Sequence, residues 1–273
     1  MHNSLDMPED NRNTGKTVLL ADDPRFRPIM QLADDAEYRE ALSRLDDLVS
    51  ELSPDERLVA EYWMIKCLLA MGDRRQARRV VDKALSRVDP NSPLKVCLEL
   101  ESANIVSAEK GPIAAADEIR TLLNRYAGKF FESADLYSAY IQAKTDLGNF
   151  LVNAGLYAEA IKDLEEALSL EDRPLSRYYI RFWLGLANHQ LGNLSKARDS
   201  LEAAIREAES APKAGIILFY AARIRYELAL IAYKEHRFDD VLRESEAALG
   251  VGFQHPDLVR GVNRLKELVD QAS

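Results

Sequence analysis

Cysteine is scarce in this sequence, with only Cys67 and Cys97 among 273 residues. Each lies within a run whose apolar residues recur at helical spacing, where a free thiol packs like a small apolar side chain. Two unpaired cysteines fit a reducing compartment, because disulfides persist mainly in oxidising ones. We therefore expect both thiols to be buried in the core, and we expect neither a disulfide nor a reactive cysteine.

Long apolar runs are absent as well. The most apolar stretch, residues 214–233, is interrupted by Arg223, Arg225 and Glu227. It predicts a buried helix and not a membrane span, which needs about 20 predominantly apolar residues. Residues 1–15 lack the apolar segment of a secretory signal. These observations predict a cytoplasmic protein without membrane insertion.

The sequence also lacks the motifs that mark common catalytic and metal sites. HExxH, CxxC, Walker and GxSxG patterns do not occur, and no glycine-rich loop follows an expected strand. The histidines have no spacing that suits a metal: His2, His189, His236 and His255. The formal net charge of -9 disfavours nucleic acid, whose binding needs a positive surface. We expect no catalytic residue, no metal, no cofactor and no nucleic-acid partner.

What the sequence does contain is a repeat. A Leu-Gly pair, a second glycine and two alanines that flank a leucine occur twice, and corresponding residues are 37 positions apart. Leucine and small residues at this spacing share one face of a helix and let a second helix cross closely. The two copies are Leu147, Gly148, Gly155, Ala160, Leu164 and Ala167, then Leu184, Gly185, Gly192, Ala197, Leu201 and Ala204.

This pattern resembles the tetratricopeptide repeat, a helix-turn-helix unit of about 34 residues. Weaker copies occur around Ala41, Ala77, Ala116 and Val241. The resemblance implies an all-α fold, a right-handed α-solenoid of about six helical hairpins. We expect residues 22–273 to form this solenoid after a mobile tail at residues 1–21. A last helix, apolar on one face only, is expected to cap its C-terminal end.

Two local features add detail. Ser53-Pro54-Asp55-Glu56 combines a serine cap, a proline in the first turn and a glutamate at the third position, which predicts a helix start. The second feature departs from the family pattern. Members usually carry a large apolar residue three positions before the Leu-Gly pair, and longer, slightly rotated first helices would accommodate the charged residues found here: Glu61, Lys144, Arg181 and Arg225.

The resemblance implies that the first helices of the hairpins line a concave groove. Aromatic and basic side chains are the usual anchors of a protein interface. The groove positions that we expect to bind a partner are Tyr62, Trp63, Lys66, Asn149, Tyr179, Phe182, Trp183, His189, Arg223, Tyr226 and Tyr233. An alternative is that several of these aromatics, above all Phe182 and Tyr226, pack between neighbouring hairpins instead.

An aromatic groove fits an extended or helical peptide. The sequence therefore predicts a non-catalytic scaffold or adaptor that binds a peptide or protein segment. One alternative is a regulatory sensor that binds a short signalling peptide and changes its superhelical shape; another is self-association through the solenoid ends. Some family members clamp a C-terminal carboxylate. Asn149 and Arg223 match that clamp, but Thr145, Trp183 and Glu227 occupy its other positions, so we do not expect it here.

Overall fold

The structure is a computed structural model that describes residues 23–210, 215–251 and 256–272. The tail predicted at residues 1–21 lies outside the described residues. Within them every regular element is an α-helix and no strand occurs. The chain divides into two compact units, Met1–Phe150 and Leu151–Ser273, and each is described by itself. The extension of one solenoid over residues 22–273 stays a prediction.

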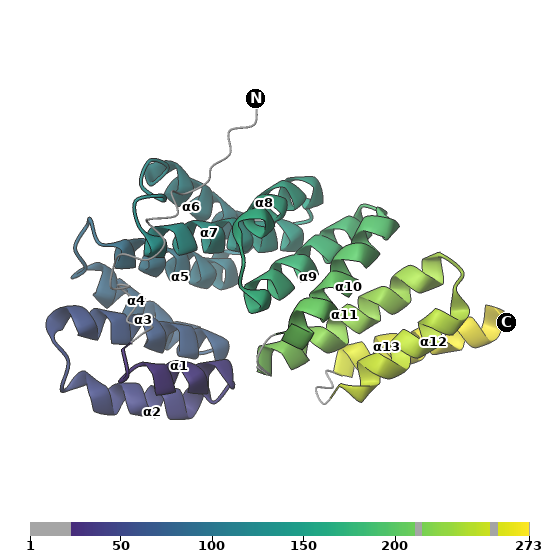
Figure 1. The fold of residues 1–273 in the computed structure, drawn as a ribbon, viewed down its shortest axis with the longest axis horizontal. Helices are drawn as coiled ribbons and strands as arrows, with labels where there is room; N and C mark the ends of the chain where they lie inside the picture. Colours follow the sequence, from purple (N-terminus) through teal and green to yellow (C-terminus); the bar gives the residue numbers. More distant parts are fainter. Residues whose placement is uncertain (1–22, 211–214, 252–255, 273) are drawn as a thin grey trace. The chain divides into compact units, whose positions relative to one another are not determined.

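The first unit is built from helical hairpins that follow one another along the chain (Figure 1). Packed pairs are α1 with α2, α3 with α4, and α5 with α6, while α3 also contacts α5. α7 begins in this unit and continues past its last residue. The helices are α1 (Arg27–Asp34), α2 (Tyr38–Val49), α3 (Pro54–Ala70), α4 (Arg74–Leu85), α5 (Pro93–Lys110), α6 (Pro112–Arg125) and α7 (Ala134–Asn153).

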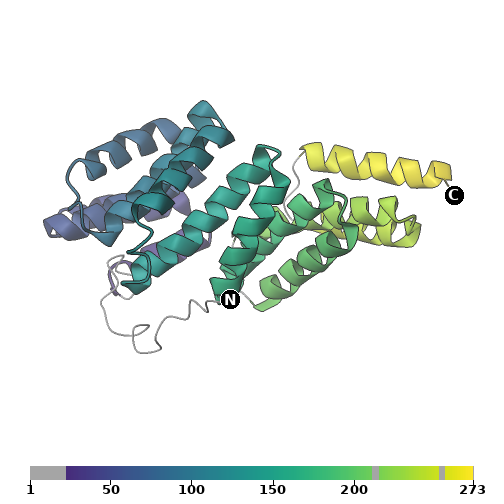
Figure 2. The ribbon, with the colours of Figure 1, turned by 90° about the horizontal axis from the view of Figure 1, so that it is seen from above.

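The second unit continues the same architecture. α9 packs against α8 and α10, α11 packs against α12, and α9 contacts α11. Figure 2 shows α13, in yellow, as the last layer of this unit, where it contacts α11 and α12. The helices are α8 (Tyr157–Leu170), α9 (Pro174–Gln190), α10 (Leu194–Ser210), α11 (Gly215–Lys234), α12 (Phe238–Gly250) and α13 (Pro256–Ala272). The predicted all-α solenoid class is confirmed.

Small side chains make close helix crossings possible in both units. The repeated alanines and the leucine between them have no exposed surface in α8 and α10, and the weaker copies behave in the same way in α2, α4 and α12. Gly185 shows how tight a crossing is, because a Cβ placed there would lie 2.5 Å from the side chain of Leu201. The repeat positions chosen from the sequence are therefore the positions where the helices meet.

The expected helix start and turns are present. Ser53 Oγ accepts from the amide of Glu56, and the Glu56 carboxylate accepts from the amide of Ser53, which completes the capping box. Gly155 and Gly192 have φ of 79° and 78°, a conformation that glycine adopts without steric cost. Ala36 and His236 stand at the same kind of turn with φ of 64° and 58°, although neither is glycine.

Ion pairs explain three of the four charged residues that depart from the family pattern. Glu61 of α3 pairs with Arg87, two residues after the end of α4. Arg181 of α9 lies 3.3 Å from Glu207 of α10, and Arg225 of α11 lies 2.8 Å from Glu244 of α12. In each of these hairpins the first helix thus presents a charge to the second helix, which offers the opposite charge.

The C-terminal helix has the amphipathic character expected of a cap. Val262, Leu265 and Val269 are buried, and the last two join the core formed with α11 and α12. The opposite face exposes charged side chains that pair within the helix, such as Arg264 with Glu267. In the described part of the chain, none of the helices has the length and apolar character that crossing a membrane requires.

Both cysteines are free and buried, as predicted. Burial raises the pKa of Cys67 to about 11 and that of Cys97 to about 12. The nucleophilic thiolate form is therefore scarce near neutral pH, and both residues act as core side chains.

Candidate functional site

The first unit places three predicted groove residues together on α3. Tyr62 is buried with 3% of its surface exposed, whereas Trp63 and Lys66 are half-buried. The Tyr62 and Trp63 rings meet edge to face with centroids 5.4 Å apart. The Lys66 ammonium lies 5.5 Å and 5.8 Å from the two ring centres, within the range of a cation–π interaction. The aromatic pair thus fixes where the lysine head group lies.

Glu101 of α5 holds a polar network beside this lysine. It is 3% exposed, and its carboxylate accepts from Asn104 at 3.1 Å and from Gln142 of α7 at 3.3 Å. Lys66 Nζ lies 3.7 Å from Glu101 Oε1. The nearby Tyr62 oxygen and Glu101 carboxylate hold the pKa of Lys66 above its ordinary value. A buried carboxylate with three partners is a stable arrangement, since an unpaired one would carry a large desolvation cost.

Asp146 of α7 lies next to the same network. Burial, and then the charge of Glu101, raise the pKa of this carboxyl to about 7, while Lys66 opposes the shift. Its Oδ2 is buried without a hydrogen-bond partner among the residues that the structure describes. Asp146 therefore changes charge near neutral pH, in contrast to an ordinary surface aspartate.

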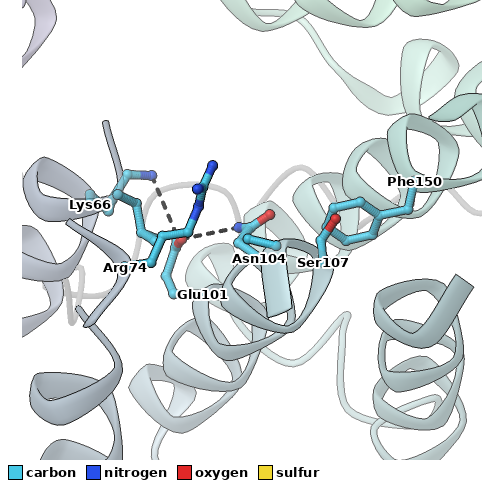
Figure 3. Close-up of a pocket in the computed structure, with 8 residues that line it drawn as sticks. Lys66, Arg74, Glu101, Asn104, Ser107 and Phe150 are labelled. Atoms are coloured by element: carbon cyan, nitrogen blue, oxygen red, sulfur yellow. Dashed lines mark hydrogen bonds and ion pairs between the residues drawn. The ribbon is translucent and has the colours of Figure 1, made fainter. Parts of the chain in front are cut away.

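A cavity of about 380 Å³ opens beside Glu101. Figure 3 shows Lys66, Arg74 and Glu101 at one end of this cavity and Phe150 at the other. Its walls come from α3, from the start of α4, from α5 and from α7: Lys66, Leu69, Arg74, Glu101, Asn104, Ser107, Ala108 and Phe150. The cavity combines charged, amide, hydroxyl and aromatic groups, and we take it as the candidate site.

In the second unit the predicted aromatic residues form a packed cluster. Phe182 and Trp183 are buried at 3% and 8% exposure, and Tyr179 is half-buried. Tyr220 of α11 joins them, with its ring centroid 4.8 Å from that of Phe182 and 5.4 Å from that of Tyr179. The cluster joins α9 to α11, so Phe182 takes the alternative role of packing between hairpins. Only Tyr179 and Tyr220 present a substantial part of their rings outside it.

A second buried polar group links the same two helices. His189 Nδ1 of α9 lies 2.8 Å from Glu227 Oε2 of α11, and both side chains are almost fully buried. Arg223 donates to the other carboxylate oxygen of Glu227 at 2.7 Å. His189 and Glu227 thus tie neighbouring hairpins together. Of the group, Arg223 alone is well exposed, with 47% of its side chain accessible.

The remaining predicted residues have separate environments. Tyr226 lies against Gly261 of α13, where an added Cβ would come within 2.6 Å of the tyrosine hydroxyl. Tyr233 packs on the core around Ala229 and Leu265. Both tyrosines therefore contribute to seating the capping helix. Asn149 of α7 is half-buried and does not line the cavity.

Sequence reasoning found Lys66 but missed most of the cavity. Glu101 and Asn104 occupy first-helix positions of the hairpin whose repeat pattern is weakest, so no register existed to select them. Arg74 lies on α4, a second helix, and so falls outside the first-helix positions that the resemblance selects. The sequence does not separate Glu101 from Glu99 two positions earlier on the same helix, and only the structure distinguishes it, by its burial at 3% exposure.

A comparison with known protein families found a match for part of the chain. A sequence model described as "Tetratricopeptide repeat" matches residues 145–212, which include both clear copies of the repeat. Residues 145–212 therefore match tetratricopeptide repeats, and the resemblance predicted from the repeated leucine, glycine and alanine positions is confirmed. The comparison with curated protein sequences found no match.

Solved structures share the fold at low sequence identity. The structure of pilF from Pseudomonas aeruginosa is 21% identical with a TM-score of 0.58, over 80% of this chain and 86% of that one. BtubC (BKLC) from P. vanneervenii is 16% identical with a TM-score of 0.56, over 85% and 94%. A thermophilic tetratricopeptide repeat protein of Thermus thermophilus is 19% identical with a TM-score of 0.52, over 76% and 98%. These likenesses concern the fold alone.

Proposed function

We propose that this protein is a non-catalytic scaffold that binds a peptide or protein segment along the first-helix face of its hairpins. The class itself supports a role in protein–protein interaction. The observation that carries the proposal is the cavity bordered by α3, α5 and α7, whose walls include the groove residue Lys66 and the polar groups of Glu101 and Asn104. Concave sites with a few placed polar groups are the usual binding sites of proteins.

The half-buried rings beside this cavity supply the apolar part of the interface. Trp63 is held by Tyr62 and Lys66 yet keeps part of its surface accessible. A tryptophan that is fixed before binding loses little conformational entropy when a partner covers it, which is why such residues act as anchors. In the second unit, Tyr179 and Tyr220 offer the comparable surface over a rigid aromatic cluster.

The chemistry of the described residues also supports a binding role. No group of three or more His, Cys, Asp and Glu side chains within the described residues could hold a metal ion. The buried His189–Glu227 pair joins two hairpins and belongs to the packing between them. The charged outer face of α13 favours a solvated end over stacking of one copy on another. We therefore propose partner binding and not assembly through the C-terminal end.

The experiment compares three immobilised proteins as baits for partners in an extract of the source cell. These are the wild type, Trp63→Ala, and the control Arg79→Ala, which alters an exposed residue on α4 away from the cavity. We expect the wild type and the control to retain the same partner. Trp63→Ala should bind this partner more weakly, by about 1 kcal/mol or more. Circular dichroism establishes that all three are folded. Equal retention by all three would place the contact elsewhere and overturn the proposal.

A further inference from the structure

The cavity in the first unit has hydrogen-bonding capacity that the protein itself does not use. Glu101 is not part of that capacity, because Lys66, Asn104 and Gln142 already surround its carboxylate. A ligand approaching the cavity therefore meets a carboxylate that is occupied and 5% exposed at its side chain. The unused groups lie elsewhere in the wall, and their chemistry decides what the cavity binds.

Arg74 is the clearest of these groups. Its side chain is exposed at the start of α4, and its guanidinium forms neither a hydrogen bond nor an ion pair with the residues that the structure describes. A guanidinium presents five donors in a planar fork that matches a carboxylate. Two other arginines of this unit are paired, Arg78 with Glu109 at 3.0 Å and Arg125 with Glu99 at 2.9 Å. Arg75 and Arg79 are exposed on the same helix, but of these three arginines it is Arg74 that lines the cavity, so its donors are the ones available to a ligand there.

Lys66 adds a second, partly engaged cation. Its ammonium carries three donors, and the contacts to Tyr62 and Glu101 are long, at 3.5 Å and 3.7 Å. The side chain is 38% exposed, so one donor can turn toward a ligand. Ser107 supplies a hydroxyl to the same wall. The unused capacity thus consists mainly of donors, and most of them belong to the two cations Arg74 and Lys66.

The opposite end of the cavity carries the aromatic ring of Phe150. Phe150, Leu69 and Ala108 complete the wall, and Figure 3 shows Phe150 at the end away from Lys66 and Arg74. A fitting ligand therefore carries an anionic group at one end and a hydrocarbon portion at the other. A cationic ligand is disfavoured, because it would meet Arg74 and Lys66 while Glu101 is already neutralised by the latter.

We propose that this cavity binds an acidic side chain of the partner segment, with its carboxylate held by Arg74 and Lys66 and its aliphatic portion lying against Phe150. The inference rests on the proposed function and names the chemistry of the partner at this cavity. Arg74 belongs to a second helix, so the set differs from the first-helix positions of the family's clamp for a C-terminal carboxylate. The residue bound here is an internal aspartate or glutamate.

The test uses small probes with the full chain, so that no partner needs to be known. N-acetyl-glutamate N-methylamide is titrated into ¹⁵N-labelled protein, and the backbone amides of residues 66, 74, 104 and 107 are followed by NMR. The glutamine compound is the neutral isostere, the lysine compound is the cationic probe, and the O-phosphoserine compound represents a phosphorylated segment. Arg74→Ala is compared with Arg75→Ala, a neighbouring exposed arginine that does not line the cavity.

We expect saturable shifts with the glutamate compound and none with the glutamine or lysine compounds. Arg74→Ala should weaken binding by about fivefold or more, since it removes a charge-assisted hydrogen-bond partner, while Arg75→Ala binds like the wild type. Equal binding of glutamine and glutamate compounds, or equal loss in the two arginine variants, would overturn the inference. Tighter binding of the phosphoserine compound would overturn the choice of a carboxylate.

The result of this titration can be separated from the result of the bait experiment that tests the proposed function. If Trp63→Ala loses a partner but the glutamate compound does not bind, the scaffold proposal stands and the acidic side chain is wrong. If the glutamate compound binds through Arg74 while all bait proteins retain the same partners, the cavity chemistry stands and the scaffold proposal fails.

Discussion

The Arg181 guanidinium on α9 lies 3.3 Å from the Glu207 carboxylate on α10, and Arg177 donates to the same oxygen at 2.8 Å. Arg181 occupies a position where the family usually places a large apolar residue. The helices of this hairpin therefore meet partly through charges, and Glu207 holds two arginines of the facing helix. This arrangement gives the first of four predictions.

Glu207→Gln should lower the free energy of unfolding at pH 7 by roughly 0.5 to 1 kcal/mol, because a partly exposed ion pair contributes little. Burial raises the pKa of Glu207, but the hydrogen bonds from Arg177 and Arg181 outweigh it and leave the pKa below its ordinary value. A depressed pKa gives stability that is present above the unfolded-state pKa and is lost as pH falls through the folded-state value.

The difference between wild type and Glu207→Gln, measured by denaturant unfolding, should therefore disappear under strongly acidic conditions. Glu202→Gln, an exposed residue of the same helix, is the matched control and should differ little from wild type at either pH. A Glu207 variant as stable as the control at pH 7 would show that the two arginines do not stabilise the hairpin.

Gly185→Ala should destabilise the second unit by roughly 1 to 3 kcal/mol, the usual cost of overpacking a core. The new Cβ would lie 2.5 Å from the Leu201 side chain and 3.3 Å from the Ala197 carbonyl oxygen, both on α10. Gly250→Ala is the control, because nothing lies within 4 Å of its added Cβ. A lowered melting temperature in the first variant alone is expected, and equal melting temperatures would mean that the crossing is looser than described.

Ala36→Gly should stabilise the first unit by about 0.5 to 1 kcal/mol. The φ of 64° at Ala36 is costly for a residue with a Cβ, and Gly72 takes the comparable conformation in the next hairpin with φ of 80°. Ala33→Gly, inside α1, should have the opposite sign, since glycine costs up to about 1 kcal/mol in a helix interior. Thermal unfolding of the two variants measures this, and a loss of stability in both would contradict the assignment of strain to Ala36.

Asp146→Asn should remove a pH dependence of stability. The raised pKa of about 7 means that the folded state favours the protonated carboxyl. Its contribution is complete below the unfolded-state pKa of about 4 and is lost as pH rises through about 7. The slope in this window is at most about 1.4 kcal/mol per pH unit.

Asparagine keeps the shape and the neutral state, so the variant should gain stability relative to wild type as pH rises from about 4 to about 7, the window between the unfolded-state pKa and the raised folded-state pKa. Urea unfolding at a series of pH values checks this, with ¹³C NMR of the Asp146 carboxyl as a direct titration. Parallel pH profiles of wild type and variant would show that the carboxylate is solvated in the folded protein.

The sequence by itself determined the class of the fold and much of its detail. Apolar and small residues recur at helical spacing, and the local capping and turn residues are read directly from neighbours in the chain. Ala160 and Ala197 marked close crossings, Ser53 marked a helix start, and Gly155 and Gly192 marked turns. These features depend on interactions within one hairpin, so their signal is contained in a short stretch of sequence.

The tertiary structure alone decided which groove residues are accessible and which polar groups meet. The sequence predicts the same role in the groove for Trp63 and Trp183. In the structure Trp63 is half-buried, whereas Tyr220 and Phe182 help to bury Trp183. Lys66, Glu101 and Asp146 come from three helices and are far apart in the chain. Their charges depend on mutual distance and burial, and neither quantity is encoded in the periodicity of a single helix.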